Sequence, residues 1–188
     1  MKLKKSFLGF ILFLFCVVNL HAQNFNGAIS SSVYAFERAE SLTDSEMFLR
    51  GYQSFILNVN QGNYSLRTRL NFETNFSKQL DSDPRLRFYN LYFEARKIAD
   101  IATIKLGRQP IFNQMAGGLF DGANIKLDVN NFIVQGYFGG NVPAYQKLEI
   151  TDDFKTDRIW GGKLAYNGLA NTSFVLSYVD KNFKFINY

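Results

Sequence analysis

Residues 63–77 constrain the fold more than any other stretch of the chain, because apolar and polar side chains alternate along them. One parity carries Tyr64, Leu66, Thr68, Leu70, Phe72, Thr74 and Phe76, and the other carries Ser65, Arg67, Arg69, Asn71, Glu73 and Asn75. Successive side chains of a strand point to opposite faces, so the segment predicts a strand with one apolar face and one charged face. About 13 alternating residues exceed the roughly 5–6 of a soluble strand and match the roughly 9–11 that cross a bilayer at a tilt. The length therefore favours a membrane-spanning strand.

Eight further segments show weaker alternation and bring the expected number of strands to nine. They are 25–36, 48–59, 86–97, 101–109, 120–129, 132–139, 158–167 and 171–180. The 20 Phe and 10 Tyr residues, set against only 3 Pro, suit strands.

The lengths of the connections decide between a soluble and a membrane fold. In order they are 37–47, 60–63, 77–85, 98–100, 110–119, 130–131, 140–157 and 168–170, so long and short alternate. Bacterial outer-membrane barrels have long extracellular loops and tight periplasmic turns, whereas a soluble all-β fold has no reason to sort its loops in this way. The sequence therefore predicts an all-β, antiparallel up-and-down transmembrane β-barrel in the bacterial outer membrane.

The first 23 residues lie outside this barrel and form a predicted secretory signal peptide, 1–23. Basic residues open it, an apolar run follows from Phe7 to Leu20, and His21-Ala22-Gln23 gives a polar exit. The apolar run is too short to favour a stable spanning helix. Cys16 raises a lipoprotein alternative, but bulky Phe15 precedes it where such signals need a small residue. The barrel domain is accordingly expected over 24–188.

Removal of the signal excludes several functional classes. Lys2, Lys4 and Lys5 leave with it, so the 21 Lys and Arg fall to 18 against 16 Asp and Glu, and nucleic acid is not an expected partner. The single Cys and the single His also lie in the signal. We therefore expect no catalytic, cofactor or metal site, and the chain is not expected to be an enzyme. A barrel lipase or protease is disfavoured for the same reason.

The strand count bears on the size of the barrel. Single-chain bacterial barrels close with an even number of strands, and nine is odd. Either the chain is the N-terminal part of a larger barrel, leaving 24–188 incomplete, or one predicted strand is wrong and eight close. The first alternative is favoured.

Closure would place the polar parity in the lumen. The charged residues expected there are Arg67, Arg69, Glu73, Glu94, Arg96, Lys105, Lys126, Asp128 and Lys163. The surplus of cations predicts a mildly positive lumen that concentrates anions. The alternative is that the charges pair with one another and plug a small barrel, which would hold for eight strands.

A short stretch carries a family resemblance. Lys105-Leu106-Gly107-Arg108-Gln109-Pro110 is followed by Met115-Ala116-Gly117-Gly118-Leu119-Phe120-Asp121-Gly122-Ala123. The stretch resembles outer-membrane porins and the alginate-export type of barrel, in which a strand ending in Leu-Gly-Arg-Gln leads into a loop that narrows the pore. The resemblance implies that Arg108 lies at the constriction, with Asp121 nearby on the returning strand.

Strict alternation, however, gives Arg108 the lipid-facing parity of Leu106. Arg108 must then lie at the rim, or the strand must bend before it, for which Gly107 would permit a bulge. The alternative is an interfacial arginine that anchors the barrel.

The expected function is a porin-like channel for passive diffusion of small hydrophilic solutes, anions included. Its partners would be outer-membrane lipid and those solutes. The alternative is a small non-conducting outer-membrane barrel with an adhesion or envelope-structural role.

Overall fold

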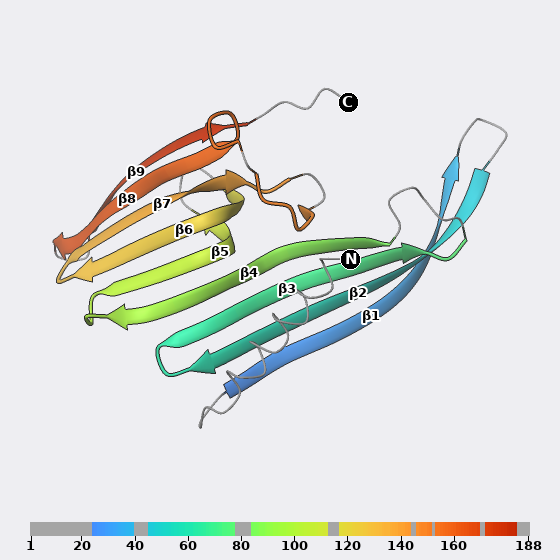
Figure 1. The fold of residues 1–188 in the computed structure, drawn as a ribbon, viewed down its shortest axis with the longest axis horizontal. Coiled ribbons are helices and arrows are strands. Elements are labelled where there is room, and N and C mark those ends of the chain that lie inside the picture. Colours follow the sequence, from blue (N-terminus) through green and yellow to red (C-terminus); the bar gives the residue numbers. More distant parts are fainter. Residues whose placement is uncertain are drawn as a thin grey trace, which may run out of the picture.

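The computed structural model describes residues 24–39, 45–77, 84–112, 117–143, 146–151, 153–169 and 172–183, and within them the chain forms one nine-stranded sheet (Figure 1). The strands are β1 (Asn24–Ala39), β2 (Ser45–Gln61), β3 (Tyr64–Asn75), β4 (Arg85–Ile98), β5 (Ala102–Phe112), β6 (Gly117–Val129), β7 (Phe132–Asn141), β8 (Arg158–Leu169) and β9 (Thr172–Asn182). Each strand pairs antiparallel with the next in sequence. The predicted all-β, up-and-down architecture is therefore confirmed. The predicted signal peptide, 1–23, lies outside the described residues.

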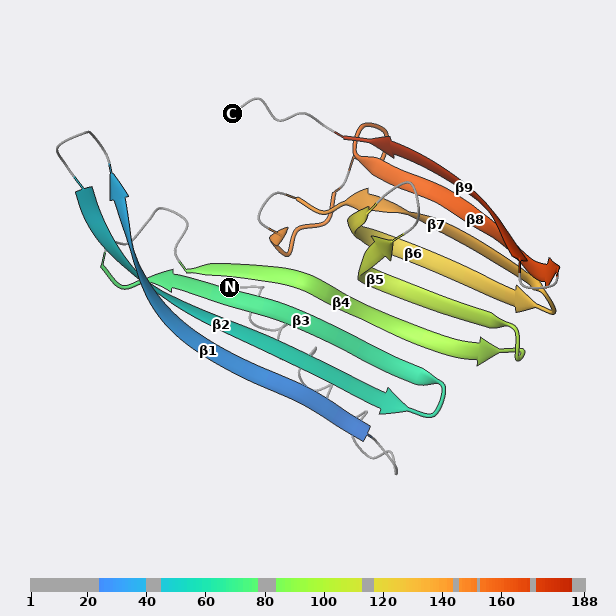
Figure 2. The ribbon, with the colours of Figure 1, turned by 180° about the vertical axis from the view of Figure 1, so that it is seen from behind.

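The sheet is open rather than closed. Figures 1 and 2 show β1 and β9 at opposite sides of the sheet, and among the described residues each pairs with only one neighbour. Eight successive antiparallel pairings leave β1 and β9 running in the same direction. All nine predicted strands are formed, so the alternative in which one of them is wrong and eight close is overturned.

None of the described residues belongs to a helix long and apolar enough to cross a membrane.

The two faces of the sheet differ in character. Residues opposite one another on neighbouring strands share a face. One face, called here the apolar face, is widely exposed, with Ile29, Leu106 and Leu176 at 74%, 51% and 72%. On the other, the polar face, Ser65 and Asn124 are only 2% and 7% exposed. Side chains crowd together on the inner side of a curved sheet, so we identify the polar face as the concave one.

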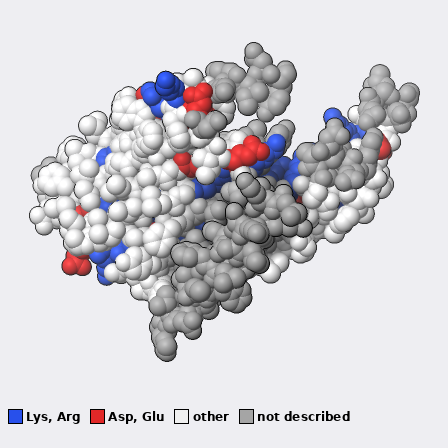
Figure 3. Space-filling model, in the orientation of Figure 1, with Lys and Arg blue, Asp and Glu red and all other residues white. Residues whose placement is uncertain are grey.

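Charged side chains are sparse on one face of β5–β9. In Figure 3 the surface over β5–β9 that faces the viewer is mostly uncharged, and Lys, Arg, Asp and Glu appear chiefly toward its ends.

Most strands extend beyond their predicted ends, and β5 does so by passing through a proline. It was expected to end at 109, with a loop over 110–119, but it continues to Phe112. Pairing between β4 and β5 ends at Leu91 and Arg108, so the last residues of β5 form an edge on that side. An edge is the setting in which Pro110 can be accommodated within a strand. The alternation of long and short connections is retained.

Three glycines lie side by side across β5, β6 and β7, and we call them the glycine row: Gly107, Gly122 and Gly139. An ideal Cβ built on any of them would lie 2.1–2.3 Å from a backbone oxygen of the adjacent strand. No other residue type fits such an approach. Gly107 also has φ +116°, a conformation that L residues with a side chain rarely adopt.

A small buried cluster lies beside the glycine row. It consists of Ile111, Phe120, Tyr137 and Ile159, with Val179 packed against it. The rings of Phe120 and Tyr137 are 5.9 Å apart between centroids. This end of β5–β9 is therefore held by apolar packing.

Candidate functional site

The structure brings the charged residues predicted for the lumen onto the polar face. Glu94 lies opposite Lys105, and Gln135 lies between Lys126 on β6 and Lys163 on β8. Cross-strand neighbours share a face, so charges from distant parts of the sequence line one surface. The same face carries Arg67, Arg69, Glu73, Arg96 and Asp128.

Sequence reasoning missed two cations of this face, Arg85 and Arg87. Simple alternation from Leu91 assigns them to the apolar face. The pairing of β3 with β4 shifts between Arg69 and Leu70, and such a bulge reverses the faces of all the residues beyond it. The signal was present in the sequence, since the apolar residues of β4 lie at even positions up to Phe88 and at odd positions from Leu91 onward.

Arg50 on β2 was missed for a different reason. Arg50 shares the polar face with Asn75, and Arg50 Nε donates a hydrogen bond to Asn75 Oδ1 at 2.8 Å. Aromatic residues on the polar parity of β2 obscured the pattern there. One of them, Phe48, belongs to an aromatic stack with Phe36, and the Arg50 guanidinium lies 5.2 Å from the Phe36 ring centroid.

Some charges of the polar face are paired and others are not. Glu73 Oε2 lies 3.2 Å from Arg87 Nη2, and Lys126 Nζ lies 2.9 Å from Asp128 Oδ2. Arg67 and Lys163 form no ion pair with any described residue. Outside these two pairs the face still carries Arg67, Arg69, Arg96, Lys105 and Lys163 against Glu94, so the charge that remains is positive.

Aromatic rings support several of the cations. The Arg69 guanidinium lies 5.6 Å from the Tyr89 ring centroid, and Lys105 Nζ lies 5.4 Å from that of Tyr92. Such contacts attract the cation to the face of the ring and hold long side chains in place.

Arg108 is enclosed by protein, so the interpretation of it as an exposed interfacial anchor is wrong. Its side chain is 2% exposed and that of Asp121 is 8%. The alternative of a bulge, which Gly107 would have permitted, is not found, because the β4–β5 and β5–β6 registers run through Gly107 without a shift. Instead the positive φ of Gly107 changes the course of the backbone where β5 leaves β4.

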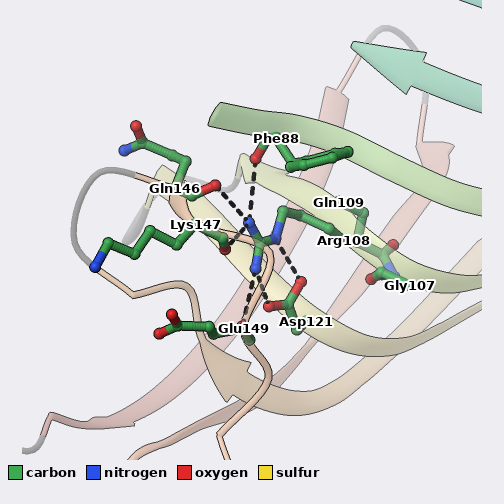
Figure 4. Close-up of polar contacts among 8 residues, drawn as sticks. All are labelled: Phe88, Gly107, Arg108, Gln109, Asp121, Gln146, Lys147 and Glu149. Atoms are coloured by element: carbon green, nitrogen blue, oxygen red, sulfur yellow. Dashed lines mark hydrogen bonds and ion pairs between the residues drawn. The ribbon is translucent and has the colours of Figure 1, made fainter. Parts of the chain in front are cut away.

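The Arg108 guanidinium joins four segments of the chain (Figure 4). Nε and Nη2 donate to the two carboxylate oxygens of Asp121 at 2.8 and 2.6 Å. Nη1 donates to the carbonyls of Phe88 on β4, Gln146 and Lys147 at 3.3, 2.9 and 2.6 Å, and Nη2 also reaches the Glu149 carbonyl at 3.1 Å. A two-pronged arginine–carboxylate pair is the strongest kind of ionic hydrogen bond. The expected proximity of Arg108 and Asp121 is thus found, and the contacts with 146–149 were not foreseen.

Gln109 completes this region. It is fully buried, and its Nε2 donates to the Gly122 carbonyl at 3.1 Å. The described residues contain no group of three or more His, Cys, Asp or Glu side chains placed to hold a metal ion.

Comparison of the sequence with protein-family models and with curated proteins finds no match in either.

Proposed function

We propose that the chain forms the wall of a porin-like channel in a bacterial outer membrane, through which small hydrophilic solutes diffuse passively, anions most readily. The observation that carries the proposal is the pair of faces: an exposed apolar face spread over the strands, opposite a concave face rich in cations. Soluble proteins rarely leave an extended apolar surface uncovered, and lipid is the surrounding that suits one. No catalytic chemistry is part of the proposal.

The dimensions of the strands support a membrane location. The shortest, β7, has 10 residues and the longest, β2, has 17. A tilted strand needs roughly 9–11 residues to cross a bilayer. Every strand of the sheet is therefore long enough to span.

Lipid also requires that the free edges of β1 and β9 be paired, because unpaired backbone groups are costly in hydrocarbon. Since β1 and β9 run in the same direction, antiparallel closure calls for an odd number of additional strands between them. A second copy inserted in the same orientation would meet the same mismatch. We therefore propose that the sheet is part of the wall of a larger barrel, wide enough to hold water.

The preference for anions follows from the charges of the concave face. Arg67 and Lys163 lack ionic partners among the described residues. Arg50, Arg85 and Arg87 add cations to this face that the sequence analysis did not include. In a narrow aqueous passage such groups raise the local concentration of anions.

The test is conductance of the full-length protein in planar bilayers. We expect discrete current steps, with a reversal potential under a KCl gradient displaced toward that of chloride. Silent bilayers at high protein load would exclude the pore. A reversal potential displaced toward that of potassium would exclude the anion preference alone.

A further inference from the structure

The connection between β7 and β8 folds back onto the apolar face of the sheet. Phe138 of β7 lies in line with Leu106 of β5 across β6, so both belong to the apolar face, and Gly140 lies on the same face two residues farther on. An ideal Cβ on Gly140 would lie 2.2 Å from Thr151 Cγ2, so the absence of a side chain there makes room for the threonine. Phe154 stacks on Phe138 at 5.9 Å between ring centroids. The connection therefore covers part of the apolar face.

The ion pair of Arg108 and Asp121 lies on this face too, beneath the connection. Arg108 comes two residues after Leu106 and pairs with Asp121, with no shift of register between the two positions. Three carbonyls of residues 146–149 accept hydrogen bonds from the guanidinium (Figure 4), and the two side chains are only 2% and 8% exposed. Charged groups are costly on a surface that meets lipid. The connection thus covers these charges and presents its own outer surface in their place.

That outer surface is amphipathic. Leu148, Ile150 and Phe154 are 56%, 73% and 40% exposed, and the exposed charged residues Lys147 and Glu149 alternate with the first two. Neither hydrocarbon nor bulk water suits both kinds of side chain. The boundary between lipid headgroups and acyl chains does, because the apolar groups can reach hydrocarbon there while the charges remain hydrated.

Aromatic side chains of β8 and β9 lie beside the connection on the apolar face. Trp160 is opposite Phe138, on which Phe154 stacks, and the Trp160 and Tyr178 rings are 5.2 Å apart between centroids. Trp160 Nε1 donates to Asp180 Oδ2 at 2.9 Å, so the indole combines an apolar ring with a polar contact. Rings of this kind concentrate where a membrane meets water. They indicate the same depth as the side chains of the connection.

We propose that the β7–β8 connection is a membrane-contact element. It lies outside the barrel wall, at the boundary between the headgroups and acyl chains of the outer leaflet, with Leu148 and Ile150 in contact with lipid. The outer leaflet follows from the length of the connection, since long connections of such barrels are extracellular. The inference rests on the proposed outer-membrane location and not on conduction. Arg108 and Asp121 are positioning residues that hold the backbone of the connection against the sheet.

Single cysteines test the contact, because the one Cys of the chain, Cys16, lies in the predicted signal peptide. In a Cys16→Ser background, Leu148→Cys and Ile150→Cys are each labelled with the fluorophore NBD, and the full-length protein is reconstituted into phosphatidylcholine vesicles with iodide on both sides of the membrane. We expect emission at shorter wavelength than in water and a loss of iodide quenching. A nitroxide near the headgroup end of the lipid acyl chain should quench both labels more than a nitroxide near the chain end.

The control is Lys155→Cys, at an exposed charged residue of the same connection. Its label should be quenched by iodide and little by either nitroxide lipid. Trp160, the one tryptophan of the chain, measures the depth of this region without label or substitution. Lipid brominated near the headgroup end of the acyl chain should quench it more than lipid brominated near the chain end.

Iodide quenching at residues 148 and 150 equal to that at 155 would overturn the lipid contact. Labels shielded from iodide and from both nitroxide lipids would place protein, such as a second copy of the chain, on the connection and would also overturn it. Stronger quenching of the labels or of Trp160 by the deep probes would contradict the depth. Wild-type protein that does not float with the vesicles would exclude the membrane location itself, and with it the proposed function.

Discussion

The glycine row offers the sharpest test of how the ends of β5–β7 are built. Replacing Gly122 by alanine would put a Cβ 2.1 Å from the Phe138 carbonyl oxygen and 2.6 Å from the Gly139 Cα. Both are backbone atoms, so no side-chain rotation can relieve the contact. An ordinary carbon–oxygen contact between strands is about 3.3–3.6 Å, and β6 and β7 would have to separate locally by more than an ångström.

A separation of that size breaks the local N–H to O bonds, each worth about 0.5–1.5 kcal/mol net. Overpacking of well-packed sites costs about 1–3 kcal/mol. We therefore expect Gly122→Ala to lower the free energy of unfolding by about 3 kcal/mol. With a urea slope of about 1–3 kcal/mol per molar, the midpoint would fall by roughly 1–3 M.

Gly136→Ala on β7 is the matched control, since an ideal Cβ at Gly136 meets nothing within 4 Å. Both substitutions change the unfolded chain in the same way, so their difference isolates the contact. Urea unfolding of the full-length protein in detergent micelles can be followed by the fluorescence of Trp160, the one tryptophan of the chain. Equal midpoints for the two variants would refute the close packing of the glycine row.

Three further predictions concern the core, the apolar face and the polar face. Phe120 is 0% exposed, and Phe120→Ala should lower the free energy of unfolding by about 3–5 kcal/mol in the same urea assay. A decrease of less than about 1 kcal/mol would show that the buried cluster around Phe120 does not stabilise the sheet. Ile125→Arg places a charge on the apolar face, and for a position at mid-depth of the bilayer it should lower the free energy of unfolding in phospholipid vesicles by about 2–4 kcal/mol. Gln135→Arg on the polar face should change that free energy little. Equal effects of the two substitutions would contradict the assignment of the two faces. Exchange of both Arg67 and Lys163 for glutamate should move the reversal potential in a KCl gradient toward that of potassium, and an unchanged potential would remove these residues from the passage.

Alternation and turn chemistry were sufficient to predict all nine strands, because both are local. The alternation along residues 64–75 reflects the two-residue period of a strand, and the residue types of Gln61-Gly62-Asn63 are sufficient to predict a turn. The positions of Lys105, Lys126 and Lys163 on one face followed from the same period. The ends of the strands were predicted less accurately. Strand β5 continues through Pro110 because β4 no longer pairs with it there, and the sequence does not show where that pairing stops.

The sequence by itself thus determined the strands, their order and the division of most side chains between two faces. Only the tertiary structure decided two matters: the open edges of β1 and β9, and the enclosure of Arg108. Each depends on partners distant along the chain. The residues of the β7–β8 connection that bind Arg108 are 38–41 positions away, and no local period can encode a contact between segments that meet only when the sheet has formed.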